Sequence, residues 1–139
     1  PELHAPELDK NQTFLGSLRD AASRGTAIYG ECGGFMVLGE MLTDENGDAH
    51  KMAGLLPVHT SFADRKLHLG YRTMVTQRAS ALGPAGQSFK GHEFHYASLS
   101  QTAGSPLFRA ADARGKTDSL VGCVQGAVCG SFLHIIDAS

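Results

Sequence analysis

The stretch AIYGECGGFMVLGE, residues 27–40, places a cysteine among glycines at the point where an apolar run becomes a helical pattern. Its centre, Gly30-Glu31-Cys32-Gly33-Gly34, has the form G-x-C-x-G between an expected strand (26–30) and an expected helix (33–42), which is the cysteine version of a nucleophile elbow. Side chains two residues before and two residues after the nucleophile would collide in such a turn, so both positions favour glycine. We therefore expect a strained backbone that pushes the sulfur of Cys32 out of the sheet.

This position suits a reactive thiol. The start of a helix favours the thiolate form of Cys32, and the N–H of Gly33 can donate a hydrogen bond to an oxyanion that forms on a substrate carbonyl. The alternative, which the elbow alone leaves open, is a buried structural cysteine at a tight packing turn.

A thiol nucleophile needs an imidazole that takes up its proton and returns it to the leaving group. His134 closes the last apolar strand, and the carboxyl ends of parallel strands meet at one edge of a sheet, so it could face Cys32 there. His92 and His95 are competing bases, but their i, i+3 spacing puts them on opposite faces of a strand. A zinc site at these two histidines would need a third ligand that the sequence does not identify, so we expect no metal.

The composition suits a single globular domain and argues against proteins that bind nucleic acid or membranes. The 139 residues suit one domain, 42% of them are apolar, and the net charge of −2 gives no basic surface for nucleic acid or a membrane. Three cysteines without C-x-x-C spacing favour reduced thiols and a cytoplasmic location. We expect Cys123 and Cys129 to be small core residues, on one face of a strand if that strand is unbroken.

The remaining pattern predicts an α/β protein with a partly parallel sheet covered on both faces. The strand at 67–77 is expected to bury the face that carries Leu67, Leu69, Tyr71, Thr73 and Val75. No strand precedes the first helix, which suggests the later portion of a longer protein. The other expected elements are a helix at 11–24, ended by Gly25, a loop at 80–91, and strands at 51–63, 92–100, 118–125 and 127–136.

The chain contains, in this order, the motifs YGECGGFMVLGE, LGYR, GHEFHYA and GSFLH, with PELHA at the start. Together they resemble the C-terminal glutamine amidotransferase domain of cobyrinic acid a,c-diamide synthases, over nearly the whole chain. The resemblance implies a three-layer, flavodoxin-like class I glutamine amidotransferase fold that is N-terminally truncated, with residues 1–139 forming a partial domain.

The resemblance also implies roles for single residues. Cys32 matches the nucleophile that attacks the side-chain amide of glutamine, His134 matches the general base and acid, and Gly33 matches the backbone donor to the oxyanion. Substrate contacts are expected from Glu93, His95 and Tyr96, although a core strand with one solvated face is the alternative reading of that segment.

Two positions depart from the class I pattern. Ile136 occupies the place, two residues after the histidine, where a glutamate usually orients it, and Asp137 is one residue too far along and should face the other side of a strand. Met36 replaces a glutamine that holds substrate in many members. We therefore expect a Cys-His dyad.

The resemblance further implies partners and cofactors. This segment needs no cofactor, whereas an N-terminal synthase domain would use ATP and Mg²⁺ to amidate the a and c carboxylates of a tetrapyrrole with the ammonia released here. A homodimer is a further expectation. The alternatives are a non-catalytic module of the same fold that binds tetrapyrrole or a partner, and another cysteine hydrolase of this fold class.

Overall fold

The computed structural model describes residues 11–63, 67–112 and 118–138, so the PELHA segment lies outside the described residues. The elements, in chain order, are α2 (Gln12–Ser23), β1 (Ile28–Glu31), α3 (Gly33–Leu38), β2 (Met41–Thr43), β3 (Ala49–Lys51), β4 (Val58–Ser61), β5 (His68–Thr76), β6 (Ser88–His95), β7 (Ser98–Thr102), β8 (Phe108–Asp112), β9 (Asp118–Val121), β10 (Cys123–Gln125), β11 (Val128–Ser131) and β12 (His134–Ala138). In this part of the chain, no helix is long and apolar enough to cross a membrane.

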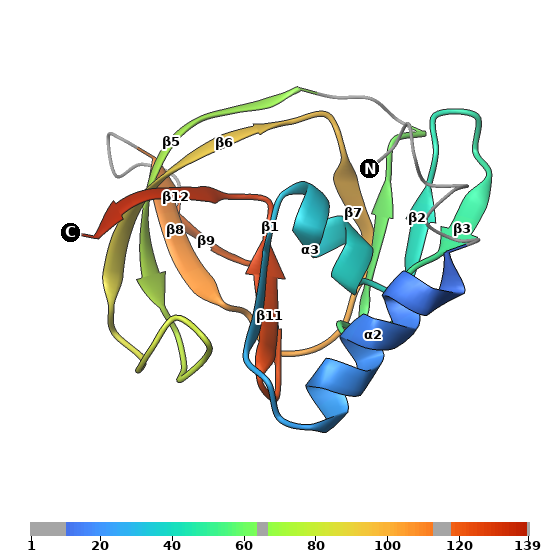
Figure 1. Cartoon of the computed structure of the whole chain (residues 1–139). Helices are drawn as coiled ribbons and strands as arrows, with labels where there is room; N and C mark the ends of the chain where they lie inside the picture. Colours follow the sequence, from blue (N-terminus) through green and yellow to red (C-terminus); the bar gives the residue numbers. More distant parts are fainter. Residues whose placement is uncertain (1–10, 64–66, 113–117, 139) are drawn as a thin grey trace.

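The described strands form three sheets, with the orders β1-β11-β10, β12-β6-β5-β8-β9 and β3-β2-β4-β7. Figure 1 shows the five-stranded sheet on one side of the molecule and the four-stranded sheet on the other, with β1, β11 and α3 between them. Only the β1–β11 and β2–β4 pairs are parallel among the described strands. The structure is therefore α/β as expected, with three sheets in place of one continuous sheet.

The parallel pair β1–β11 positions the elbow. Its register runs from Ile28 opposite Val128 to Glu31 opposite Ser131, and the N–H of Cys32 continues the ladder with a 2.8 Å hydrogen bond to the carbonyl of Ser131. Because the two strands run in the same direction, the residues that follow them leave the sheet at the same edge.

The helix predicted at 11–24 is confirmed as α2. The side chain of Asn11 caps its start by accepting a hydrogen bond from the N–H of Phe14 at 3.1 Å. Gly25, with φ +78°, follows the last turn in the left-handed conformation that glycine adopts without strain. The helix predicted at 33–42 is shorter than expected, because residues 41–43 form β2, which pairs with β3 and β4.

The prediction for the buried face of β5 was wrong. Leu69 and Tyr71 are exposed, whereas Met74 and Thr76 are buried, so the inward face carries the even-numbered residues. The sequence pattern misled because the inward face includes two polar residues: Arg72, which pairs with Glu93, and His68, whose ring stacks on that of His95 (described below).

The core positions predicted for Cys123 and Cys129 are confirmed, and both are free thiols. They do not share a strand, because Gly126, with φ +60°, turns the chain between β10 and β11. Cys123 packs in the cluster with Phe35 and Leu56, whereas Cys129 packs in a second cluster with Met74 and Phe108.

Replacing Gly30 by alanine should destabilise the protein by about 1–3 kcal/mol, because the new Cβ would lie 2.7 Å from the carbonyl carbon of Gly34, a backbone atom that cannot rotate away. The collision expected at Gly34 is not found, because a Cβ there has no neighbour within 4 Å, so Gly34→Ala is the matched control. Chemical denaturation of the intact variants measures both. Equal stability of the two variants would show that the elbow does not require a glycine at position 30.

Candidate functional site

Cys32 occupies a strained position between β1 and α3. Its backbone angles are φ 51° and ψ −103°, and among the described residues it is the only non-glycine with a positive φ. Such a conformation costs about 1–3 kcal/mol and persists only where the surrounding structure holds it. The hydrogen bond from its N–H to Ser131 and the close approach of Gly30 to Gly34 hold it here. The side chain is partly exposed, as a nucleophile must be.

Gly33 is the first residue of α3. The N–H groups of a helix's first turn have no acceptor within the helix, so the N–H of Gly33 is available to a group that reacts with the neighbouring thiol. This placement fits the role in an oxyanion hole that the resemblance implies for it.

His134 begins β12, three residues after the end of β11, and its side chain is partly exposed. It therefore leaves the small sheet at the edge where Cys32 leaves it. In the neighbouring five-stranded sheet it pairs directly with His92 of β6, whose ring contacts Tyr71 of β5 at 5.3 Å between centroids. The competing base His92 thus lies beside His134.

Glu31 was not among the expected site residues. Its Oε1 lies 3.6 Å from Nδ1 of His134, an ion-pair distance that is longer than a hydrogen bond. Its Oε2 accepts two hydrogen bonds of 2.9 Å, one from the hydroxyl of Tyr29 and one from the N–H of Ile135. Burial, and then the carboxylate of Glu31, raises the pKa of Tyr29, so the hydroxyl remains a donor. The signal in the sequence was the glutamate of the E-C-G-G motif, immediately before the cysteine.

The strand after His134 is not regular. Ile135 pairs with Gly91 and Asp137 pairs with Lys90, so Ile136 forms a bulge and its side chain is exposed. The bulge places Asp137 on the same face as His134, which corrects the expectation of an opposite face. That expectation assumed an unbroken strand, in which successive side chains alternate.

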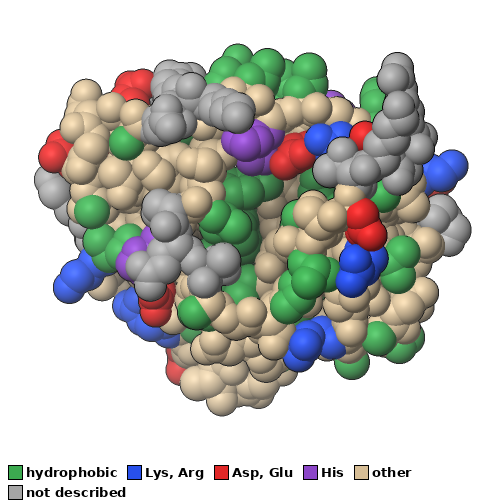
Figure 2. All heavy atoms as spheres, turned by 180° about the vertical axis from the view of Figure 1, so that it is seen from behind, with side chains coloured by type: hydrophobic (Ala, Val, Ile, Leu, Met, Phe, Trp, Pro, Cys, Tyr) green, Lys and Arg blue, Asp and Glu red, His purple; other side chains and the backbone are tan. Residues whose placement is uncertain are grey.

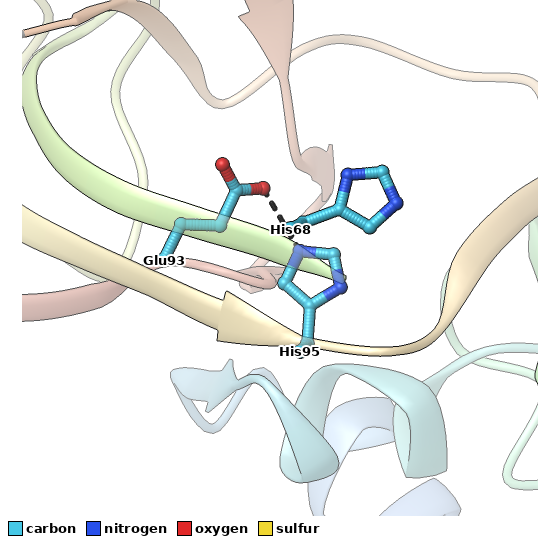
Figure 3. A group of neighbouring side chains, drawn as sticks. All are labelled: His68, Glu93 and His95. Atoms are coloured by element: carbon cyan, nitrogen blue, oxygen red, sulfur yellow. Dashed lines mark hydrogen bonds and ion pairs between the residues drawn. The ribbon is translucent and has the colours of Figure 1, made fainter. Parts of the chain in front are cut away.

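Glu93 and His95 lie on the other face of the five-stranded sheet. Successive residues of β6 alternate, so these side chains point away from the face that His92 shares with His134. Figure 3 shows Glu93 directed at His95, with the hydrogen bond between them and His68 alongside. The side chains of Glu93 and His95 are therefore separated from that of His134 by this sheet.

The buried ring of His95 is held on every side. Its Nδ1 donates to the carbonyl of Ala97 at 2.7 Å, its Nε2 lies 2.8 Å from Oε2 of Glu93, and its plane stacks between Phe132 and His68. Arg72 pairs with the other oxygen of Glu93 at 3.0 Å. Both nitrogens of His95 therefore face an oxygen atom, one of the backbone and one of Glu93.

These residues line a cavity of about 530 Å³ together with apolar side chains, among them Phe35, Leu99, Leu120 and Phe132. Figure 2 shows a hollow on this side of the molecule with hydrophobic side chains inside it and histidine, acidic and basic side chains along its edge. The third expected substrate residue, Tyr96, is exposed beyond the end of β6, with its ring edge against Phe94.

The third ligand that the sequence could not identify for a metal site is present in space. His68, Glu93 and His95 each offer one ligand atom, and these atoms lie within 4.8 Å of one another. Two observations argue against a metal ion here: Arg72 already pairs with Glu93, and the rings of His68 and His95 stack nearly in parallel, at 13°.

Alkylation should distinguish the three cysteines. Burial raises the pKa of Cys123 and Cys129, whereas Cys32 is partly exposed in the elbow. Iodoacetamide at neutral pH should therefore modify Cys32 first, because the thiolate is the reactive form. Peptide mass spectrometry of the folded protein measures the order, and first modification of either core cysteine would contradict the placement of Cys32.

The stability of the protein should depend on Glu93 in acid. The hydrogen bond from His95 lowers the pKa of Glu93, so ionised Glu93 stabilises the fold above the pKa of an unfolded glutamate, about 4.3, and this stabilisation is lost as the pH falls through the lower, folded value. Glu93→Gln should lower the melting temperature at pH 7 and flatten its decline between about pH 5 and pH 3.

Asp137→Asn, which removes an exposed carboxylate, is the control for this pH series. If the melting temperature of the Glu93→Gln variant declined between about pH 5 and pH 3 as steeply as that of the wild type, the pair with His95 would contribute nothing to folding.

Comparison with known proteins identifies a family for this chain. The model of the CobB/CobQ-like glutamine amidotransferase domain matches residues 1–139. Two similar relatives are hydrogenobyrinate a,c-diamide synthases, one from Brucella anthropi with 50% identity over 138 residues and one from Brucella abortus with 49% identity over 142 residues. These alignments cover 99% and 100% of this chain but 31% of each relative, so the chain spans about a third of their length.

A solved structure described as a glutamine amidotransferase is similar in fold, with a TM-score of 0.59 and 20% identity. The match covers 86% of this chain and 58% of that one. At this identity the similarity concerns the fold alone.

Proposed function

We propose a function for this chain, which belongs to the CobB/CobQ-like glutamine amidotransferase domain family: it hydrolyses glutamine at Cys32, with His134 as base and acid, and releases ammonia. The observation that carries the proposal is the strained Cys32, which leaves the β1–β11 pair at the same edge as His134. The buried Cys123 and Cys129 have no such strain, and a strained, partly exposed thiol between a strand and a helix is the geometry of a nucleophile elbow.

The proposed chemistry uses three groups: the thiol of Cys32, the ring of His134 and the N–H of Gly33. His134 takes the proton of Cys32, and the sulfur attacks the carbonyl carbon of the glutamine side chain, giving a tetrahedral intermediate with a negative oxygen. The N–H of Gly33 donates to that oxygen. His134 then returns the proton to the amide nitrogen as the C–N bond breaks, which leaves ammonia and a γ-glutamyl thioester. Water activated by His134 hydrolyses the thioester and restores the thiol.

The relatives suggest the use of the ammonia. Their name describes the amidation of the a and c carboxylates of hydrogenobyrinate. We extend this to the protein that contains the present chain: ATP and Mg²⁺ at a synthase domain would activate two carboxylates of cobyrinate or a related tetrapyrrole. The three-layer, flavodoxin-like arrangement, the cytoplasmic location and the homodimer belong to the same proposal.

One observation favours a second candidate, a module that binds without catalysis. The cavity beside Arg72, Glu93 and His95 combines apolar walls with fixed charges, and it lies on the face of the sheet away from His134. A ligand with apolar and carboxylate parts, such as a tetrapyrrole, fits that chemistry. Glu93 and His95 are predicted contacts of this second ligand, because the sheet separates them from His134, and Tyr96, exposed beyond the end of β6, stays a predicted substrate contact.

Cys32→Ala should separate these functions. It should lower glutamine hydrolysis, and amidation with glutamine as donor, by at least about 1000-fold while sparing amidation with free ammonia. Ammonia release and product formation by the intact enzyme measure the two activities. Cys123→Ala is the control, because it makes the same substitution in the core.

Full glutamine-dependent activity in the Cys32→Ala variant would exclude the proposed nucleophile. Absence of glutamine hydrolysis in the wild-type protein would favour the binding module.

A further inference from the structure

We propose that Glu31 is the positioning residue for His134 and completes a triad in which the carboxylate comes from the elbow itself. The inference rests on the proposed function, because it assigns a partner to the base of that reaction. The usual position for the carboxylate, two residues after the histidine, is the exposed bulge residue Ile136. The carboxylate of Glu31 instead reaches Nδ1 of the ring from the neighbouring strand.

The two oxygens of Glu31 have different tasks. Oε2 is fixed by the hydroxyl of Tyr29 and the N–H of Ile135, each at 2.9 Å, so the carboxylate cannot turn freely. The second of these bonds ties Glu31 to the residue directly after His134, which sets the distance between the carboxylate and the ring. Oε1 is then the oxygen that faces Nδ1, at 3.6 Å.

A carboxylate opposite Nδ1 keeps a proton on that nitrogen. The neutral ring then carries its lone pair on Nε2, which is the nitrogen left to accept a proton from a thiol. The carboxylate also stabilises the imidazolium that forms during the reaction. Catalytic hydrogen bonds are commonly long before substrate binds, so a 3.6 Å separation suits a pair that closes when the ring becomes charged.

The other groups near the ring act differently. His92 lies across from His134 on β6, with Tyr71 of β5 against it, and neither side chain is a carboxylate. Asp137 shares the face of β12 through the bulge, and its side chain is exposed. Among the described carboxylates, Glu31 is the one whose oxygen is recorded within 4 Å of the His134 ring.

Glu31 directly precedes the nucleophile in the chain. Glu31 is the last residue of β1 and Cys32 follows it, so one strand end supplies both the nucleophile and the group that orients its base. Alternation along β1 places Tyr29 and Glu31 on the same side, which explains their hydrogen bond.

Glu31→Gln is the decisive variant. The amide oxygen can keep both hydrogen bonds of Oε2, while the amide NH₂ would face Nδ1 of His134 and favour the wrong tautomer. We expect glutamine hydrolysis to fall about 10- to 100-fold, with ammonia-dependent amidation and melting temperature close to wild type. Glu31→Asp, with a shorter carboxylate, should restore part of the activity, and Asp137→Asn should leave it unchanged.

Two readouts separate positioning from structure. The pH profile of Cys32 alkylation should shift in Glu31→Gln, because loss of the negative charge disfavours the imidazolium of His134, and ¹⁵N NMR of the His134 ring should report a change of tautomer. Wild-type kinetics in Glu31→Gln, or a loss of activity in Asp137→Asn alone, would overturn the proposal. A wild-type protein that hydrolyses no glutamine would refute the proposed function, whereas an unaltered His134 spectrum in Glu31→Gln would refute this inference separately.

Discussion

The parallel pairing of β1 with β11 is the constraint on which the site depends. Four residue pairs align the strands, and the hydrogen bond from the N–H of Cys32 to Ser131 extends the ladder into the turn. Without this pairing, no backbone contact would hold the chain after Glu31 next to the chain that leads to His134. Glu31, Cys32 and the chain that leads to His134 thus leave the small sheet at one edge because of backbone contacts alone.

The same pairing holds a conformation that the isolated segment would avoid. A positive φ at Cys32 is unfavourable for a residue with a Cβ, and it persists because α3 packs closely on β1 through Gly30. Phe35 and Leu38 of α3 are buried in the core, so the free energy of burial opposes relaxation of the turn. Part of the stability of the fold is therefore used to keep one thiol presented to solvent.

The sequence predicted what depends on local patterns. The helix α2, with Asn11 and Gly25 at its ends, and the elbow around Cys32 both follow from residues close together in the chain.

The predictions of which side chains share one face of a strand were wrong where contacts between residues far apart in the chain determine that face. Nothing near Leu69 or Tyr71 indicates that Arg72 meets Glu93 across the strands, or that this pair draws the even-numbered face inward. Likewise, the bulge at Ile136 and the turn at Gly126 change which side chains share a face, and neither has a strong signal. Glu31 was visible in its motif, but its contact with His134 joins residues 103 positions apart in the chain.

Gly30 and Gly130 lie opposite each other on β1 and β11. A Cβ on Gly130 would come 2.5 Å from the carbonyl oxygen of Gly30, and a Cβ on Gly30 would meet the backbone of Gly34, so each glycine is required by a main-chain atom. Because the obstacle is a main-chain atom in each case, a smaller side chain at another position cannot make room for the new Cβ. In an alignment of relatives, these two neighbours should therefore be constant without covarying, and a contact-inference method that depends on compensating substitutions would overlook the pair of strands that builds the site.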